Sequence, residues 1–238
     1  MKDNNICRLC NAISDLQESH IIPSSIIKLV RDKKLGNRFY ELHNKSSQII
    51  QDCPKEYLLC QNCEQKIGGY EKYFKEAIHL SRHGIEIRQT NQYAVFDNLD
   101  YKKIKLFFLS LLWRMSVSSL PEFDNVCTGD NEETIRQMII KGDPGNSSEY
   151  PVSVIIPLFN QRMQEGWATT AFVSKDLQII GILLGGILYL LSTIRQNSFF
   201  PTEWYLNLLN ESGHWIMPWT DFYNIPFLRE YNENRFKG

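Results

Sequence analysis

The chain has 238 residues, of which 43% are hydrophobic, and its formal net charge at pH 7 is −1. This length is enough to bury a hydrophobic core, which excludes a small fold that depends on disulfides for its stability. The charge is uneven: residues 1–115 hold 18 Lys and Arg against 13 Asp and Glu, or +5, and the remainder holds 8 against 14, or −6. The sign of the first half agrees with contact to phosphate groups.

Residues 1–5 contain no apolar segment of the kind that marks a secretory signal peptide. The sequence therefore predicts a cytoplasmic protein. Cysteines stay reduced in that compartment, so paired cysteines indicate a bound metal rather than disulfides.

Four of the six cysteines form two C-x-x-C pairs. The two-residue gap lets both thiolates of a pair reach the same ion, so the pairs predict one tetrahedral Zn²⁺ site, against the alternative of four unrelated buried thiols. The two remaining cysteines, Cys53 and Cys127, have no such partner and are expected to be ordinary buried thiols. The predicted zinc ligands are Cys7, Cys10, Cys60 and Cys63.

The first predicted elements follow the first cysteine pair. A helix is predicted over residues 24–36, where two serines supply a start and a glycine supplies a stop. Short strands are predicted at residues 47–51 and 57–59. From residue 70 onward apolar side chains recur with helical spacing and predict an amphipathic helix, whose approach is bent by the Gly68-Gly69 pair.

The middle of the chain is predicted to be helical. Residues 101–120 are apolar over most of the circumference of a helix and belong in the interior. Asp130 and Glu133 have the three-residue offset of a capping box, and Gly142 marks the end of the helix that they begin. Residues 143–148, with their Gly, Pro, Asn and Ser, predict a linker.

Strand patterns dominate the last third, at residues 152–156, 171–173 and 179–194. The last of these is interrupted by Gly185-Gly186 and has two interpretations. Its 16 residues fall short of the roughly 20 that a membrane-spanning helix needs, whereas Gly-Gly suits the tight turn of a hairpin between buried strands. A hairpin is therefore favoured over a membrane anchor.

Together these patterns predict an α+β protein with an antiparallel C-terminal β region. Three segments are predicted: residues 1–90 around the cysteine pairs, residues 91–145 as a helical connector, and residues 146–238, rich in strands and aromatic side chains. The C-terminal segment is expected to regulate the first, to form a homo-oligomer, or to bind a regulatory partner.

One histidine lies in a recognisable context between the cysteine pairs. A C-x-x-C pair, then His20 followed by Ile-Ile-Pro, then Leu-Leu-Cys-x-x-Cys running into a helix, resembles the zinc-stapled branch of the HNH, or ββα-metal, endonucleases over residues 7–75. The resemblance implies two strands and a helix that present a histidine as general base to a water molecule. It also implies one divalent cation, separate from the structural zinc, that holds the scissile phosphate.

The resemblance implies roles for the residues of this sequence that align with functional positions of the family. The resemblance implies that His20 is the general base and that Glu64 is the helix-borne ligand of a catalytic Mg²⁺ or Mn²⁺. The four paired cysteines align with the ligands of the structural zinc. The basic residues that would meet DNA phosphates are Lys28, Arg31, Lys33, Lys34 and Lys66.

Three positions depart from the family pattern. Ser19 stands where the family has a metal-binding Asp or His, and Lys55 stands where it has the Asn that orients the histidine. Glu64 replaces a His or Asn. The candidate substitutes among nearby carboxylates are Glu18, Asp52 and Glu71.

The leading hypothesis is a metal-dependent nuclease that hydrolyses phosphodiester bonds, with DNA as the substrate implied by the family. A role in phage defence or as a toxin follows only by analogy with isolated bacterial nuclease domains. The alternative is a catalytically inactive zinc ribbon that binds nucleic acid or a protein partner, in which His20 is structural. The missing Asp and Asn favour that alternative.

Three other histidines are assigned no catalytic role. His79 and His83 are four residues apart on a predicted helix and are expected on a solvated face. His214 is expected to be structural.

Overall fold

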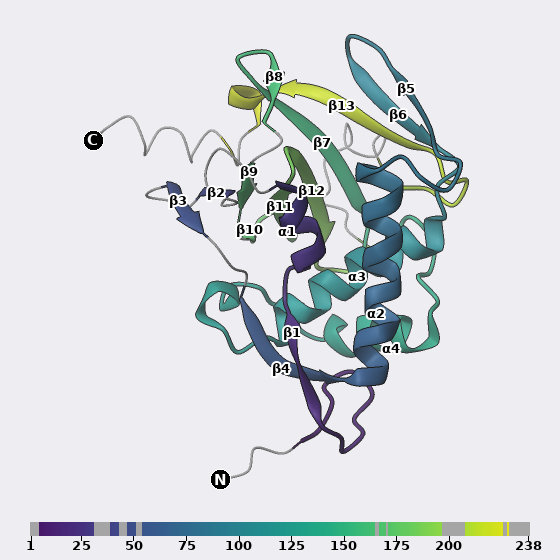
Figure 1. The fold of residues 1–238 in the computed structure, drawn as a ribbon, viewed down its shortest axis with the longest axis vertical. Helices are drawn as coiled ribbons and strands as arrows, with labels where there is room; N and C mark the ends of the chain where they lie inside the picture. The colour runs from purple at the N-terminus through teal and green to yellow at the C-terminus, as the bar shows by residue number, and fades with distance from the viewer. Residues whose placement is uncertain are drawn as a thin grey trace.

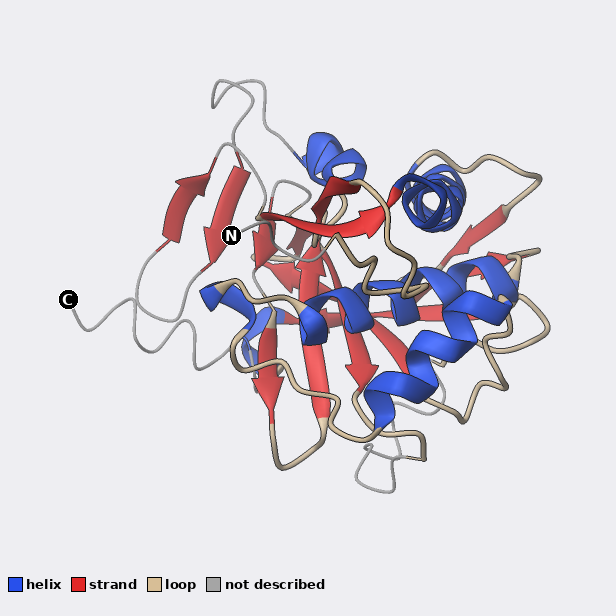
Figure 2. Ribbon diagram, turned by 90° about the horizontal axis from the view of Figure 1, so that it is seen from below, coloured by secondary structure: helices blue, strands red, loops and turns tan. Residues whose placement is uncertain are grey.

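The computed structural model describes residues 5–30, 39–42, 47–50, 54–164, 167–169, 171–196 and 208–225, and Leu228. The chain has an α+β fold in which the helices lie across the strands of a large sheet (Figures 1 and 2). The helices are α1 Ser24–Val30, α2 Gln61–Phe74, α3 Tyr101–Val117 and α4 Asn131–Lys141, with a π-helical turn η2 Lys75–His79 and two 3₁₀ turns, η3 Pro121–Phe123 and η5 Phe222–Asn224.

In the described part of the chain the strands form two sheets. A small one pairs β1 Leu16–His20 with β4 Lys55–Cys60, and a large one follows the order β3-β2-β9-β11-β12-β7-β13-β6-β5, with β10 paired to β11 and β8 paired to β7. The strands of the large sheet are β2 Phe39–Leu42, β3 Ser47–Ile50, β5 Glu86–Gln89, β6 Tyr93–Asp97, β7 Val152–Phe159, β8 Arg162–Met163, β9 Trp167–Thr169, β10 Phe172–Ser174, β11 Ile179–Leu184, β12 Ile187–Ser192 and β13 Trp215–Asp221.

Most pairs of C-terminal strands are antiparallel, as the sequence predicts. Strand β12 pairs antiparallel with both β11 and β7. Parallel pairing occurs where β13 joins β7 and where β2 joins β9. The aromatic-rich tail, expected only to pack across the core, therefore contributes β13 to the interior of the sheet, between β7 and β6.

The hairpin predicted around Gly185-Gly186 is confirmed. Strands β11 and β12 pair up to Leu184 opposite Ile187, and both glycines of the two-residue turn have positive φ, 62° and 77°. This is the conformation that favours Gly-Gly in a tight hairpin. All residues of both strands are buried, which explains their continuous apolar sequence. Among the described residues no helix has the length and apolar character that crossing a membrane requires.

Helix α3 lies in the interior, as predicted, and ends at Val117. Its Phe107 stacks on Phe74 of α2 with ring centroids 4.1 Å apart, and its Phe108 contacts Tyr189 of β12 at 5.1 Å. One cluster of buried side chains extends through all three predicted segments, from Cys7 to Met217. The division at residues 90 and 145 stays a prediction.

Two local expectations were wrong. Helix α2 begins at Gln61, and Gly68-Gly69 lie inside it without bending its approach. The predicted capping box does not form, because the Asp130 side chain makes no cap hydrogen bond and Glu133 instead pairs with Arg136. The predicted C-terminal stop is confirmed: Gly142 has φ 65°, and its N–H donates to carbonyls of the last turn. The expected stop of α1 near residue 36 lies outside the described residues.

Candidate metal centre and the strand–strand–helix unit

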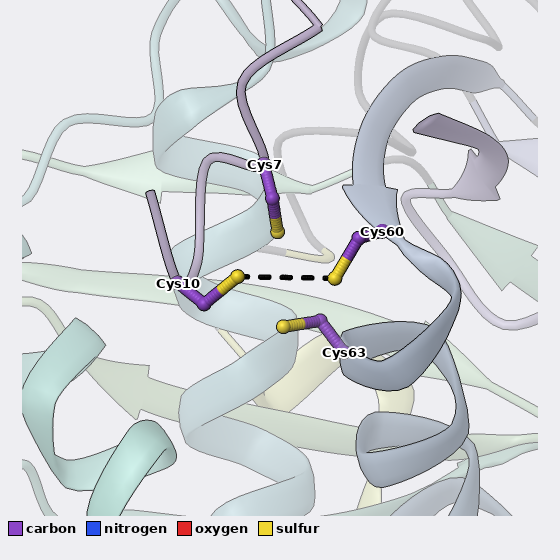
Figure 3. A group of neighbouring side chains, drawn as sticks. All are labelled: Cys7, Cys10, Cys60 and Cys63. Carbon is purple, nitrogen blue, oxygen red and sulfur yellow. Dashed lines mark hydrogen bonds between the residues drawn. The ribbon is translucent and has the colours of Figure 1, made fainter. Parts of the chain in front are cut away.

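The two C-x-x-C pairs converge on one point (Figure 3). Cys7 and Cys10 lie in the turn before β1, Cys60 ends β4, and Cys63 lies in the first turn of α2. The four Sγ atoms all lie within 4.8 Å of one another, and those of Cys10 and Cys60 are 3.8 Å apart. A tetrahedral Zn²⁺ with Zn–S bonds of about 2.3 Å sets its sulfur atoms about 3.8 Å apart. The cysteine cluster, defined by these four residues, therefore fits a zinc ion.

Backbone hydrogen bonds fold the first pair into a knuckle. The N–H of Asn11 donates to the carbonyl of Cys7 at 2.8 Å, and Asn11 has φ 60°, a conformation that Asn tolerates better than most residues. The N–H of Arg8 donates to the carbonyl of Leu58 in β4 at 3.0 Å. The knuckle is therefore attached to β4 as well as to the ion that it would hold.

Burial and neighbouring groups shift the pKa of three of the four thiols. Burial raises the pKa of Cys7, but N–H groups of Cys10, Cys60 and Leu9 that point at its sulfur outweigh that effect and bring the pKa to about 7. Burial raises the pKa of Cys10 and Cys63, and for Cys63 the neighbouring thiols raise it further. A divalent cation would remove the penalty that burial places on the thiolates of Cys10 and Cys63.

Helix α4 supports the cluster from the side. The Arg136 guanidinium donates through Nη1 to the carbonyl of Leu9, inside the knuckle, and through Nε to Glu133 at 2.6 Å. Its pKa is raised first by Glu133 and also by Cys7 and Cys10. A cation beside four thiolates offsets part of their negative charge.

Of the two unpaired cysteines, Cys127 is exposed, so the prediction that it is buried was wrong. It lies on a loop between η3 and α4. Cys53 lies outside the described residues. Among the described cysteines none forms a disulfide.

The small sheet and α2 form a strand–strand–helix unit, called here the ββα unit. Strand β1 runs antiparallel to β4, with Leu16 opposite Cys60 and His20 opposite Lys55. Helix α2 follows β4 directly and contacts both strands (Figure 1). The cysteine cluster thus closes one end of the unit, and His20 ends β1 at the other.

His20 is half-buried and shares a strand face with two charged neighbours. Residues opposite one another in an antiparallel pair point to the same side, so His20 and Lys55 lie on one face. The Lys55 ammonium pairs with the carboxylate of Glu18 at 3.7 Å. Ser19 points the other way, is 1% exposed, and donates weakly from Oγ to the carbonyl of Gln17 at 3.4 Å.

The backbone of His20 is fixed by a buried arginine. Arg114 of α3 donates from Nη1 to the His20 carbonyl at 2.8 Å, and its Nη2 lies 2.7 Å from Oε1 of Glu71 in α2. The Arg114 side chain is 2% exposed and that of Glu71 is 18% exposed. This ion pair joins α3, α2 and the end of β1 behind the histidine.

Glu71 and Glu64 lie at different levels of the unit. Strand β1 rises about 3.3 Å per residue, so Leu16 and His20 are about 13 Å apart along it. Helix α2 rises about 1.5 Å per residue, so Glu64 lies about 5 Å beyond Gln61 and Glu71 about 15 Å beyond it. Glu71 therefore reaches the level of His20. Glu64 lies nearer the cysteine cluster, with its Oε1 buried and unpaired among the described residues.

The basic residues expected to meet phosphates are only partly described. Lys28 is exposed on α1. The Lys66 ammonium donates to the carbonyl of Ile140 at the end of α4, so it is already used within the molecule. Arg31, Lys33 and Lys34 lie outside the described residues, as does Asp52.

The other histidines divide differently from expectation. His83 is exposed, as expected, and its Nε2 lies 2.9 Å from Glu76. His79 is not on a solvated face: its Nε2 is buried, and burial lowers its pKa to about 4. Nδ1 of His214 lies 2.6 Å from Asp97, beside β13.

Two functional candidates escaped sequence reasoning, Arg114 and Arg136. Arg114 is the only charged residue after Lys105 in the apolar helix α3, and a lone charge in such a run signals a buried, paired group. Arg136 carries no comparable signal, because it lies on an amphipathic helix.

Comparisons with protein-family models, with curated proteins and with solved structures find no match to this chain.

Proposed function

We propose that this protein is a metal-dependent nuclease of the HNH type, in which His20 is the general base. The observation that carries the proposal is the ββα unit itself: an antiparallel pair, followed directly by a helix, with four thiols converging where strand and helix meet. This is the arrangement that the sequence resemblance implies. Its zinc would hold the turn before β1 against the start of α2, and so fix the strand that ends in His20.

The surroundings of His20 support a role in proton transfer. Its carbonyl accepts from Arg114, which restricts the backbone, while the side chain lies on the half-exposed face of β1. A base held in one orientation needs less reorganisation when it deprotonates a water molecule. Lys55, opposite His20, would supply positive charge where a scissile phosphate approaches.

Glu64 is the ligand that the resemblance implies for a catalytic Mg²⁺ or Mn²⁺. It lies about 8 Å short of His20 along the unit, so an ion that it binds would reach His20 through water or substrate. A buried carboxylate oxygen without a partner is costly, and a hard cation is one group that would satisfy it. Glu71 is less suited, because one of its oxygens already pairs with Arg114. We therefore assign Glu71 and Arg114 as positioning residues for His20. DNA remains the proposed substrate by family analogy, and phage defence the proposed setting.

The test is cleavage of supercoiled plasmid by the purified protein with Mg²⁺ or Mn²⁺. Wild type should nick the plasmid, and His20→Ala should reduce the rate at least about 100-fold, as expected for loss of a general base. His83→Ala is the matched control, since His83 is an exposed histidine outside the ββα unit, with its side chain bonded to Glu76 and packed against Tyr73. Equal rates for wild type and His20→Ala would reject the assignment, provided that both retain equal zinc.

A second candidate function is binding of nucleic acid without cleavage. It is favoured by Ser19, whose hydroxyl is buried and bonded to backbone where the family has a metal-binding side chain. A salt-sensitive gel shift of DNA, with no nicking at any Mg²⁺ or Mn²⁺ concentration, would support it over catalysis.

A further inference from the structure

A pocket of about 340 Å³ lies outside the ββα unit, between the π-helical turn η2 that follows α2 and the large sheet, including its β5–β6 hairpin. Its walls are largely apolar and include Ile87, Phe96 and Ile187. Among the described residues that line it there is no Asp, Glu, Lys or Arg. The volume falls within the range of about 300–1,000 Å³ that is usual for small-molecule sites.

Two buried polar atoms belong to residues that line this pocket. Nε2 of His79 and Nε1 of Trp219 are both buried, and neither has a hydrogen-bond partner among the described residues. Leaving such a group unpaired costs about 1–3 kcal/mol, so each needs an explanation. Neither nitrogen has surface open to the pocket, so a ligand reaches them only if the side chains that cover them turn aside. A ligand that then bonds to both would supply the missing partners.

The chemistry of these two atoms restricts that ligand. The indole N–H of Trp219 can only donate, so the ligand must carry an acceptor. Burial keeps His79 neutral at pH 7, because its pKa falls to about 4, and a neutral imidazole can donate or accept. A charged ligand would find no counter-charge on the described walls.

The backbone around His79 is unusual in a way that fits a site. Helix α2 continues into η2, a single π-helical turn that ends at His79. Such turns are rare and frequently occur at functional sites. The ring of His79 packs edge-on against Phe74 with centroids 5.8 Å apart, which holds the imidazole in one orientation.

We propose that this pocket binds a small, uncharged, largely apolar molecule that carries a hydrogen-bond acceptor, held by the Trp219 N–H and by His79. The site is separate from the cysteine cluster and from His20, and it does not depend on the nuclease function. The ligand would bind at the large sheet, independently of the proposed nuclease site.

The test uses three probes of similar shape, titrated into the full-length protein at pH 7.5 by ligand-observed NMR. Quinoline offers a ring-nitrogen acceptor, naphthalene offers none, and naphthalene-2-sulfonate carries a charge. Quinoline should bind saturably with one site per chain, at least about fivefold more tightly than naphthalene, which corresponds to one hydrogen bond. The sulfonate should bind more weakly than both.

Variants locate the binding. Trp219→Phe and His79→Leu each remove one of the two nitrogens, and at least one should abolish the preference for quinoline over naphthalene. Trp113→Phe is the matched control, because Nε1 of Trp113 is also buried and unpaired among the described residues but Trp113 is not among those lining the pocket. This variant should bind as wild type does. The proposal is overturned if neither neutral probe binds saturably, if the sulfonate binds most tightly, or if both pocket variants keep the wild-type preference.

Discussion

Replacing Arg114 by methionine is expected to destabilise the protein strongly, because Arg114 joins three elements behind His20. Methionine keeps most of the apolar stem and removes the guanidinium. The substitution removes the 2.8 Å hydrogen bond to the His20 carbonyl, the 2.7 Å ion pair with Glu71 and the 3.3 Å hydrogen bond from Nε to the Ser110 carbonyl. Helix α3, helix α2 and strand β1 would then be held together by apolar packing alone at this point.

The magnitude follows from burial. Removing one partner of a buried ion pair costs about 3–5 kcal/mol. The Glu71 side chain is 18% exposed, so water can reach its freed carboxylate, and the lower end of that range, about 3 kcal/mol, is expected. For a chain of this size 1 kcal/mol lowers Tm by about 2–4 °C, so Tm should fall by about 6–12 °C.

The assay is thermal unfolding of zinc-loaded protein, with Arg88→Met as the control. Arg88 pairs with Asp97 at the same 2.7 Å, but its side chain is 67% exposed, so the cost should stay below about 1 kcal/mol. Arg114→Met combined with Glu71→Gln should lower the free energy of unfolding by less than the sum of the two single variants, because both substitutions remove the same ion pair. If Arg114→Met lowers Tm no more than Arg88→Met does, the buried ion pair does not join the elements as argued.

Two further predictions concern stability. Burial lowers the pKa of His79 from 6.5 to about 4, so the unfolded chain binds the proton more tightly than the folded chain does. The stability that neutral His79 contributes is therefore complete above pH 6.5 and is lost as pH falls towards 4. His79→Leu should remove up to about 3 kcal/mol of this acid sensitivity in unfolding measurements from pH 7 to 4.5, and an unchanged pH profile would contradict the burial argument. Gly213→Ala should lower the free energy of unfolding by more than about 2 kcal/mol, because at φ 74° the new Cβ would lie 2.2 Å from the Leu99 carbonyl oxygen. Gly129→Ala, at φ 52° with open space around the position, should lower it by only about 1 kcal/mol in the same thermal unfolding assay. Equal losses would show that the close approach to Leu99 is relieved easily.

Features fixed by local chemistry were predicted from the sequence. The two-residue gaps of the C-x-x-C pairs, the Gly185-Gly186 turn and the Gly142 stop all act over a few residues, and the structure has each of them where the pattern predicts it. The sequence also predicts the α+β class, because strand and helix periodicities are local.

Long-range pairing could not be predicted in the same way. Strand β13 enters the sheet between β7 and β6, and β2 joins β9 from more than 120 residues away. Which strands pair over such distances depends on how both faces of the sheet are buried, and a short sequence pattern contains no information about that. The interpretation of Gly68-Gly69 as a bend failed for a related reason: tertiary packing of α2 outweighs the low helix propensity of glycine.

Of the candidate site, the structure confirms that the four paired cysteines lie together, and the roles of the other residues stay predictions. The sequence pattern led to the four cysteines and to the strand that ends in His20, but it could not rank the carboxylates. Only the register of β1 against β4, together with the Arg114 ion pair, brings Glu71 to the level of His20. His79 was placed on the surface because i, i+4 spacing on a helix says nothing about which face is covered.

Four thiolates are expected to hold one zinc ion that closes the ββα unit. Zinc analysis combined with X-ray absorption on anaerobically purified protein tests it directly, with Cys127→Ser as the control for Cys63→Ser, since Cys127 is exposed and outside the cluster. Wild type and Cys127→Ser should each hold one zinc per chain with four sulfur ligands at about 2.3 Å, and Cys63→Ser should lose it. Purified wild type without zinc, or Cys63→Ser with as much zinc as Cys127→Ser, would show that the four thiols do not hold the ion.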